Sequence, residues 1–137
     1  MGGRKGLRSY GSMTYAGLKS MLYAKLGKDD VRVKAAHEWV RQNFTFDENP
    51  GIGAQGHFYY LHTVAKALAV YGEDVVVDAK GAKHAWRIEF VEKLLAMQKP
   101  EGYWVNEASG RWMESMPELV TAYAMISLEV AAGDALR

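Results

Sequence analysis

Residues 90–104 constrain the fold more than any other part of the chain. They begin as an amphipathic segment with a Phe and Leu face, pass through Gln98 into a turn that contains Pro100 and Gly102, and end on two aromatic residues, the second being Trp104. A helix of this pattern can bury its apolar face, and the Gln98 amide can bond backbone groups left free where the helix ends. Trp104 can fold back over the turn. The stretch therefore predicts a helix whose carboxyl end is clasped by the residues that follow it.

Apolar residues at helical spacing predict five helices. They are expected at residues 13–26, 30–43, 56–71, 86–97 and 117–132. Ser12 is expected to cap the first helix and Gly27 to end it, while Asp29 and Asp30 place negative charge at the start of the second. Residues 75–84 hold two β-prone arms around a glycine, which predicts a small β-hairpin between the third and fourth helices.

Three of the predicted helices resemble one another. Residues 14–22, 60–68 and 121–128 are each rich in small residues and aromatic near their start. Two amphipathic segments of another type, residues 36–43 and 91–98, lie between them, so the chain repeats a helix pair with a period of about 50 residues. Small residues allow the first type of helix to pack closely, and the second type keeps one wet face. The pattern predicts an all-α fold of the α/α toroid type, with three inner helices covered by two outer ones.

Two motifs give this architecture a family resemblance. The chain reads L-L-x-x-Q-x-x-x-G-x-W at residues 94–104 and T-A-Y-A-x-x-x-L-E at residues 121–129. Both patterns look like the repeats of the squalene-hopene cyclase and protein prenyltransferase family, and the first is similar to the QW motif of that family. The likeness extends over nearly the whole chain from about Tyr10, and residues 9–21 and 47–51 look like a bacterial branch of squalene-cyclase-like proteins.

The resemblance implies a part-ring. Complete rings in that family hold more helices than are predicted here, so both ends of the inner layer would expose apolar flanks. The first repeat also departs from the motif, because Gln42 is not followed by G-x-W. We expect residues 1–10 to form a flexible N-terminal segment and residues 11–137 a single domain, composed of repeat one at 12–53, repeat two at 56–104 and the third inner helix at 117–132. The need to cover the exposed flanks predicts a homo-oligomer, with a two-fold dimer favoured.

Composition and charge exclude several classes of protein. The 17 basic and 16 acidic residues leave a net charge of +1 and form no basic stripe, so we expect no nucleic-acid partner. No apolar run approaches the roughly 20 residues of a transmembrane helix. Residues 1–8 are basic but no apolar segment follows them, so no signal peptide is predicted and the compartment stays open. The absence of cysteine excludes disulfides, thiolate metal sites and cysteine nucleophiles.

The catalytic motifs that the resemblance implies are missing from the sequence. No D-x-D-D sequence occurs, and the residues after Asp29 and Asp30 do not complete D-D-x-x-D/E. The four histidines are scattered and no cysteine accompanies them, so we expect neither a metal site nor a cofactor. Residues 51–56 spell G-x-G-x-x-G, but no strand precedes them, which favours a flexible turn over a nucleotide site. Whether this chain is an enzyme therefore stays open.

Three polar residues are the candidates for catalysis. His62 lies mid-helix among apolar residues, where it could donate a proton into an aromatic cavity or simply be a buried, hydrogen-bonded histidine. Glu107 and Glu114 fall in the segment before the last helix, which would rim the opening of a ring. There they could act as acid or base, although solvated loop charge is the alternative.

Aromatic residues at helical spacing are the candidates for ligand binding. They could line a cavity and stabilise a carbocation through cation–π attraction, or they could be ordinary core. The candidates, with the one histidine beside them, are Tyr15, Tyr59, Tyr60, His62, Trp112 and Tyr123. Two functions remain open. One is a terpene-cyclase-like protein that binds an apolar isoprenoid, and the other is a non-catalytic binding or assembly module that uses the same fold.

Overall fold

The computed structural model describes residues 9–133, which form five α-helices, a short 3-10 turn and a two-stranded antiparallel sheet. The helices are α1 (Gly11–Tyr23), α2 (Val31–Gln42), α3 (His57–Tyr71), α4 (Trp86–Met97) and α5 (Pro117–Ala132). The strands β1 (Val75–Val77) and β2 (Lys83–Ala85) form a hairpin between α3 and α4. The predicted all-α fold with a small β-hairpin is confirmed. Of the predicted flexible segment 1–10, residues 1–8 lie outside the described residues.

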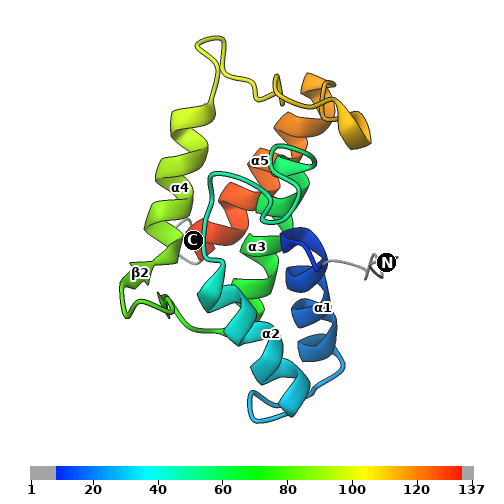
Figure 1. The fold of residues 1–137 in the computed structure, drawn as a ribbon. Helices are drawn as coiled ribbons and strands as arrows, with labels where there is room; N and C mark the ends of the chain where they lie inside the picture. The colour runs from blue at the N-terminus through cyan, green and yellow to red at the C-terminus, as the bar shows by residue number, and fades with distance from the viewer. Residues whose placement is uncertain (1–8, 134–137) are drawn as a thin grey trace, which may run out of the picture.

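Helix α3 lies at the centre of the molecule, with α1 along one side and α5 along the other (Figure 1). Helix α2 packs on α1, and α4 packs on α5. The three similar segments of the sequence therefore stand side by side, as the repeat pattern predicts. Helix α3 can take the central place because it is apolar on nearly all sides, with Val64, Ala65 and Ala67 fully buried.

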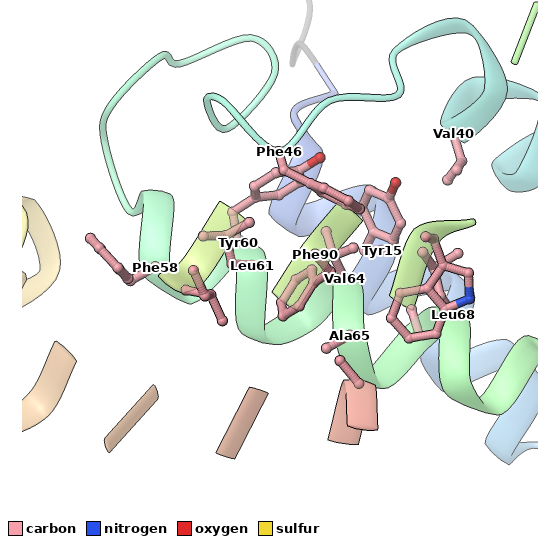
Figure 2. Close-up of a cluster of buried hydrophobic side chains, with 14 of the residues drawn as sticks. Tyr15, Val40, Phe46, Phe58, Tyr60, Leu61, Val64, Ala65, Leu68 and Phe90 are labelled. Atoms are coloured by element: carbon pink, nitrogen blue, oxygen red, sulfur yellow. The ribbon is translucent and has the colours of Figure 1, made fainter. Parts of the chain in front are cut away.

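The core forms where residues from several elements meet on α3. Figure 2 shows Tyr15 of α1, Phe46 of the loop between α2 and α3, and Phe90 of α4 in one cluster with side chains of α3. The Phe46 and Phe90 rings are 5.3 Å apart between centroids and nearly perpendicular. Burial of such a side chain contributes about 1.5–3 kcal/mol. The loop before α3 and helix α4 are thus held to the central helix by the same aromatic contacts.

The predicted clasp at the end of α4 is present, but the side chain that bonds the helix end is Trp104 and not Gln98. The indole Nε1 of Trp104 donates to the carbonyl oxygen of Leu94 at 2.8 Å, and Nε2 of Gln98 donates to the carbonyl oxygen of Gly102 at 2.9 Å. Leu94 is in the last turn of α4, where carbonyl groups have no partner within the helix. Trp104 thus satisfies the helix end while its ring is buried, and Gln98 closes the turn.

The start of α1 is held by a distant loop rather than by its own side chain. Tyr10 takes the cap position without a side-chain bond, and Ser12 lies inside the helix. The buried Asn49 accepts the Ser12 amide N–H at 3.0 Å through Oδ1 and donates to the Ser12 hydroxyl at 3.2 Å through Nδ2. The prediction of Ser12 as the N-cap is wrong, because Asn49 supplies the acceptor from another part of the chain.

The end of α1 also differs from the sequence prediction. The helix ends at Tyr23, and Lys25 takes the left-handed conformation, with φ of 64°, that was expected of Gly27. The N–H of Leu26 bonds the carbonyl of Met21 at 3.1 Å, a bond from beyond the helix to its last turn. Leu26 packs against the core. This apolar contact ends the helix earlier than the glycine would.

The β-hairpin is fixed to the helices on either side of it. Arg41 at the end of α2 donates from Nε to the carbonyl of Val77 at 2.7 Å. The His84 ring lies between two carboxylates, with Nε2 3.0 Å from Oδ2 of Asp78 and Nδ1 3.0 Å from Oε2 of Glu89. Asp78 is in the hairpin turn and Glu89 is in the first turn of α4. His84 therefore connects the hairpin to α4.

Candidate functional site

A pocket with a cavity volume of about 360 Å³ opens at the amino-terminal ends of α1 and α3. Its lining residues come from four parts of the chain and are mostly aromatic. They are Tyr10, Ser12, Met13, Tyr59, Trp112 and Tyr123. Tyr59 is in the first turn of α3, Tyr123 is in α5, and Trp112 is in the short 3-10 turn before α5. Three of the predicted ligand-binding residues, Tyr59, Trp112 and Tyr123, therefore share one pocket.

Glu114, two residues after Trp112, is fully buried, with 0% of its surface exposed. Its Oε1 accepts the Phe58 amide N–H at 3.0 Å, and its Oε2 accepts the Tyr59 amide N–H at 2.8 Å. Nδ2 of Asn106 donates to Oε1 at 3.0 Å. A carboxylate at this position accepts hydrogen bonds from free N–H groups of α3, and its negative charge interacts favourably with the positive end of the helix dipole. The geometry therefore makes Glu114 the residue that fixes the loop before α5 to the start of α3.

Trp112 is held as a wall of the pocket by contacts on its ring. Its φ of 56° and that of Met113, 65°, are in the left-handed region, which costs non-glycine residues about 1–3 kcal/mol each. A Cβ atom at Gly56 would lie 2.4 Å from the Trp112 ring, so only glycine allows this approach. The Arg111 guanidinium lies 4.3 Å from the ring centroid and pairs with Gln55. The G-x-G-x-x-G sequence that ends at Gly56 is a turn leading into α3, as expected.

His62 lies about one turn further along α3 than Tyr59. Its ring centroid is 5.4 Å from that of Tyr123, which in turn is 6.1 Å from that of Tyr59. The Nδ1 atom of His62 is buried and has no hydrogen-bond partner among the described residues. Burial, together with the positive charges of Lys66 and Lys19, lowers the pKa of His62 to about 4. The ring is therefore neutral at pH 7, and it is not itself among the residues that line the pocket.

Tyr15 and Tyr60 lie in the core instead of the pocket. Both are fully buried, and their rings meet edge to face with centroids 5.6 Å apart. The Tyr60 hydroxyl donates to the carbonyl of Thr45 at 2.7 Å, whereas the Tyr15 hydroxyl has no partner among the described residues. Burial raises the pKa of both tyrosines. The structure therefore separates these two residues from the other ligand-binding candidates.

Glu107 lies on another part of the surface. It is exposed, and its Oε1 is 2.7 Å from Nζ of Lys99. It lines a larger groove of about 570 Å³ between the end of α4 and the loop before α3. His57 lines the same groove, and its Nε2 is 2.8 Å from the carbonyl oxygen of Phe46. Burial lowers the pKa of His57. The structure does not bring Glu107 together with His62 or Glu114.

Three lining residues were not predicted from the sequence. Tyr10 precedes α1, Ser12 was interpreted as a cap, and Met13 was counted as an ordinary helix residue. The aromatic side chain of Tyr10, directly before α1, was the only local sign in the sequence that this part of the chain lines a pocket. Their place in the pocket depends on how α1 packs along α3, which the sequence alone does not fix.

One class of site and one class of element are not found in the described part of the chain. Within residues 9–133, no cluster of three or more histidine, aspartate or glutamate side chains has an arrangement that could bind a metal ion. Over the same residues, no helix has both the length and the apolar character that a membrane span requires.

No protein-family model matches the chain, and neither a curated protein nor a solved structure matches it. The fold and the geometry of the aromatic pocket are therefore what supports a functional proposal.

Proposed function

We propose that this chain is a squalene-cyclase-like α/α-repeat protein that binds an apolar isoprenoid in the pocket at the start of α1 and α3. The observation that carries the proposal is the convergence of Tyr59, Trp112 and Tyr123 on one cavity from three different elements. Aromatic faces bury large apolar areas and attract groups that carry positive charge. A flexible, methyl-rich hydrocarbon fits such a lining.

The proposal concerns binding and assigns no reaction. The polar groups among the lining side chains are the hydroxyls of Ser12 and the tyrosines and the indole N–H of Trp112, and no carboxylate is among them. Glu114 lies close by, but three donors already occupy its oxygens. Protonation of an alkene needs a strong acid in contact with the substrate. Ligand binding is therefore the function that these side chains support best.

A titration with farnesol and squalene tests the proposal. We expect a saturable change in tryptophan fluorescence that Trp112→Phe removes, because Trp112 is the tryptophan in the pocket wall. Tyr123→Ala should weaken binding by about tenfold, which corresponds to ~1.4 kcal/mol. Tyr23→Ala, a change at an exposed tyrosine of α1 away from the pocket, is the matched control and should bind as the unchanged protein does. Absence of saturation, or an equal loss in both tyrosine variants, would overturn the proposal.

A second candidate function is assembly. Ile88 and Leu95 of α4 and Met125 and Ile126 of α5 are exposed apolar side chains, with 62% of Ile88 and 61% of Met125 accessible. Exposed apolar surface that gathers on two packed helices is typical of an interaction surface. We propose that a second copy of the chain covers this α4–α5 flank. The fold would then serve as an assembly module, and its ring would be extended by oligomerisation.

A further inference from the structure

The groove between the end of α4 and the loop before α3 shares no lining residue with the aromatic pocket. It has a cavity volume of about 570 Å³. His57, the first residue of α3, lines it together with Ala96 and Met97 from the last turn of α4. The fold thus brings the start of one helix and the end of another to a single cavity.

Two backbone carbonyls at the end of α4 have no hydrogen-bond partner among the described residues. In a longer helix the Ala96 carbonyl would accept the N–H of residue 100, but Pro100 has no N–H. The Met97 carbonyl is also free, because the helix ends there and no donor from elsewhere in residues 9–133 reaches it. The last carbonyls of a helix carry the negative end of its dipole, which attracts positive charge.

His57 adds a third acceptor to the same groove. Only 8% of its surface is exposed, and its Nε2 carries a proton, because the partner of Nε2 is the carbonyl oxygen of Phe46, which can only accept. Burial lowers the pKa of His57, so the ring is neutral at pH 7 and Nδ1 keeps a lone pair. No described residue bonds Nδ1. The enclosed side-chain atoms without a partner in residues 9–133 belong to Tyr15 and His62, so Nδ1 of His57 is open to solvent on the groove that the residue lines.

The side-chain donors around the groove already have acceptors. Nε2 of Gln98 bonds a backbone carbonyl at 2.9 Å, and Nδ2 of Asn106 bonds a backbone carbonyl at 2.7 Å and a carboxylate at 3.0 Å. Nζ of Lys99 is 2.7 Å from Oε1 of Glu107, and both residues line the groove. The lining side chains therefore use their donors within the protein, whereas acceptors are left over for a ligand.

We infer that this groove binds a primary ammonium group on an aliphatic stem. An ammonium carries three N–H donors and a positive charge, which suit the unpaired acceptors on His57, Ala96 and Met97 and the negative end of α4. The stem would contact the lining side chains of Phe58 and Val105. A free alkylamine and the side chain of a lysine on another protein present this same chemistry. The site does not depend on the isoprenoid pocket.

Titration with hexylamine tests the site, with hexanol as the uncharged probe of the same length. The NMR amide signals of residues 96–108 should shift and saturate with hexylamine at pH 7 and not with hexanol. His57→Gln keeps a side-chain N–H in place of Nε2–H and removes Nδ1, so it should weaken binding by about tenfold. Lys99→Met leaves the Glu107 carboxylate unpaired and should strengthen binding by about threefold. Lys34→Met, at an exposed lysine of α2, is the matched control and should bind as the unchanged protein does.

The amide of Nα-acetyl-lysine distinguishes the two sources of the ammonium group. Tighter binding of this compound than of hexylamine supports a lysine side chain as the ligand, and the reverse order supports a free amine. Circular dichroism of each variant checks that the helices are intact, and Lys99→Met, a change at the surface, carries the test if His57→Gln does not fold.

Three results would overturn the site. They are an equal response to hexanol, a response that sodium chloride at equal ionic strength reproduces, and binding by His57→Gln and Lys99→Met that equals that of Lys34→Met. Because the groove and the aromatic pocket share no lining residue, the outcome is independent of the farnesol titration. Failure of the amine titration removes only the ammonium site, and failure of the farnesol titration removes only the isoprenoid pocket.

Discussion

At the scale of single residues, Glu114 contributes most to the geometry of the site. It is fully buried and accepts three hydrogen bonds, two of them from the first turn of α3. A sequence prediction could propose it only as a rim carboxylate, because its partners lie 55 and 56 positions away along the chain. Its contacts connect the pocket wall around Trp112 to Tyr59. The residue thus positions pocket side chains without touching the cavity itself.

Removal of this carboxylate should destabilise the whole protein. Glu114→Ala leaves three buried donors without an acceptor, and we expect the free energy of unfolding to fall by about 3 kcal/mol. Glu101→Ala, at an exposed glutamate in the turn after α4, is the control and should change it by less than about 0.5 kcal/mol. Urea denaturation measures both values. Equal effects in the two variants would contradict the role given to Glu114.

At the scale of secondary-structure elements, the connections between neighbours are as important as the helices themselves. The clasp of Trp104 ends α4, Asn49 holds the start of α1, and His84 connects the hairpin to α4. Both ring nitrogens of His84 face carboxylates, so the charged ring makes both hydrogen bonds and the neutral ring only one. Partial burial disfavours the charge, but Asp78 and Glu89 outweigh it and raise the pKa of His84 above its ordinary value.

This connection should make stability depend on pH. A raised pKa in the folded protein means that His84 stabilises it fully below about pH 6.5, the ordinary pKa, and that this contribution is lost as the pH rises through the folded value. Urea denaturation at pH 5.5 and pH 8 measures the free energy of unfolding of the unchanged protein and of His84→Gln. The unchanged protein should be more stable than His84→Gln by a margin that shrinks as the pH rises. Burial lowers the pKa of His37, so the free energy of unfolding of the unchanged protein relative to that of His37→Gln should increase as the pH rises. The same slope in both comparisons would contradict this interpretation.

At the scale of the whole molecule, three inner helices stand side by side with one outer helix packed at each end (Figure 1). Only α3 has an inner helix on both sides. Helix α5 has α3 on one side, and its exposed Met125 and Ile126 mark a side that no described element covers. The exposed residues of the α4–α5 flank are not among those that line the aromatic pocket, so covering the flank would leave the pocket accessible.

If a second copy covers that flank, the mass in solution should exceed that of one chain. We expect sedimentation equilibrium at micromolar concentration to report a dimer, and Met125→Lys to shift it toward the monomer of 15.3 kDa, because a buried unpaired charge disfavours the interface. Met13→Lys, at an exposed methionine of α1 outside this flank, is the control. A monodisperse monomer of the unchanged protein would remove the assembly proposal and leave the pocket unaffected.

Local sequence determined most of the fold. Helices α4 and α5 begin and end at the predicted residues, and α3, expected at residues 56–71, begins one residue later at His57 and ends at Tyr71. The hairpin and the clasp of Trp104 also follow from nearby residues. Helical periodicity, terminal caps and tight turns depend on neighbours within a few positions, so one sequence carries their signal. The repeat of similar segments further indicated which helices would stand side by side.

Tertiary packing decided the rest. Tyr59 and Tyr60 are adjacent on α3, yet Tyr59 lines the pocket and Tyr60 is in the core, because the positions of α1 and α5 determine what each helix face meets. The end of α1 at Tyr23, the left-handed backbone of Trp112 and the three bonds of Glu114 depend in the same way on residues distant in sequence. Side-chain contacts across helices are stabilised by burial and by hydrogen bonds that form only after the chain has folded, so no local pattern specifies them.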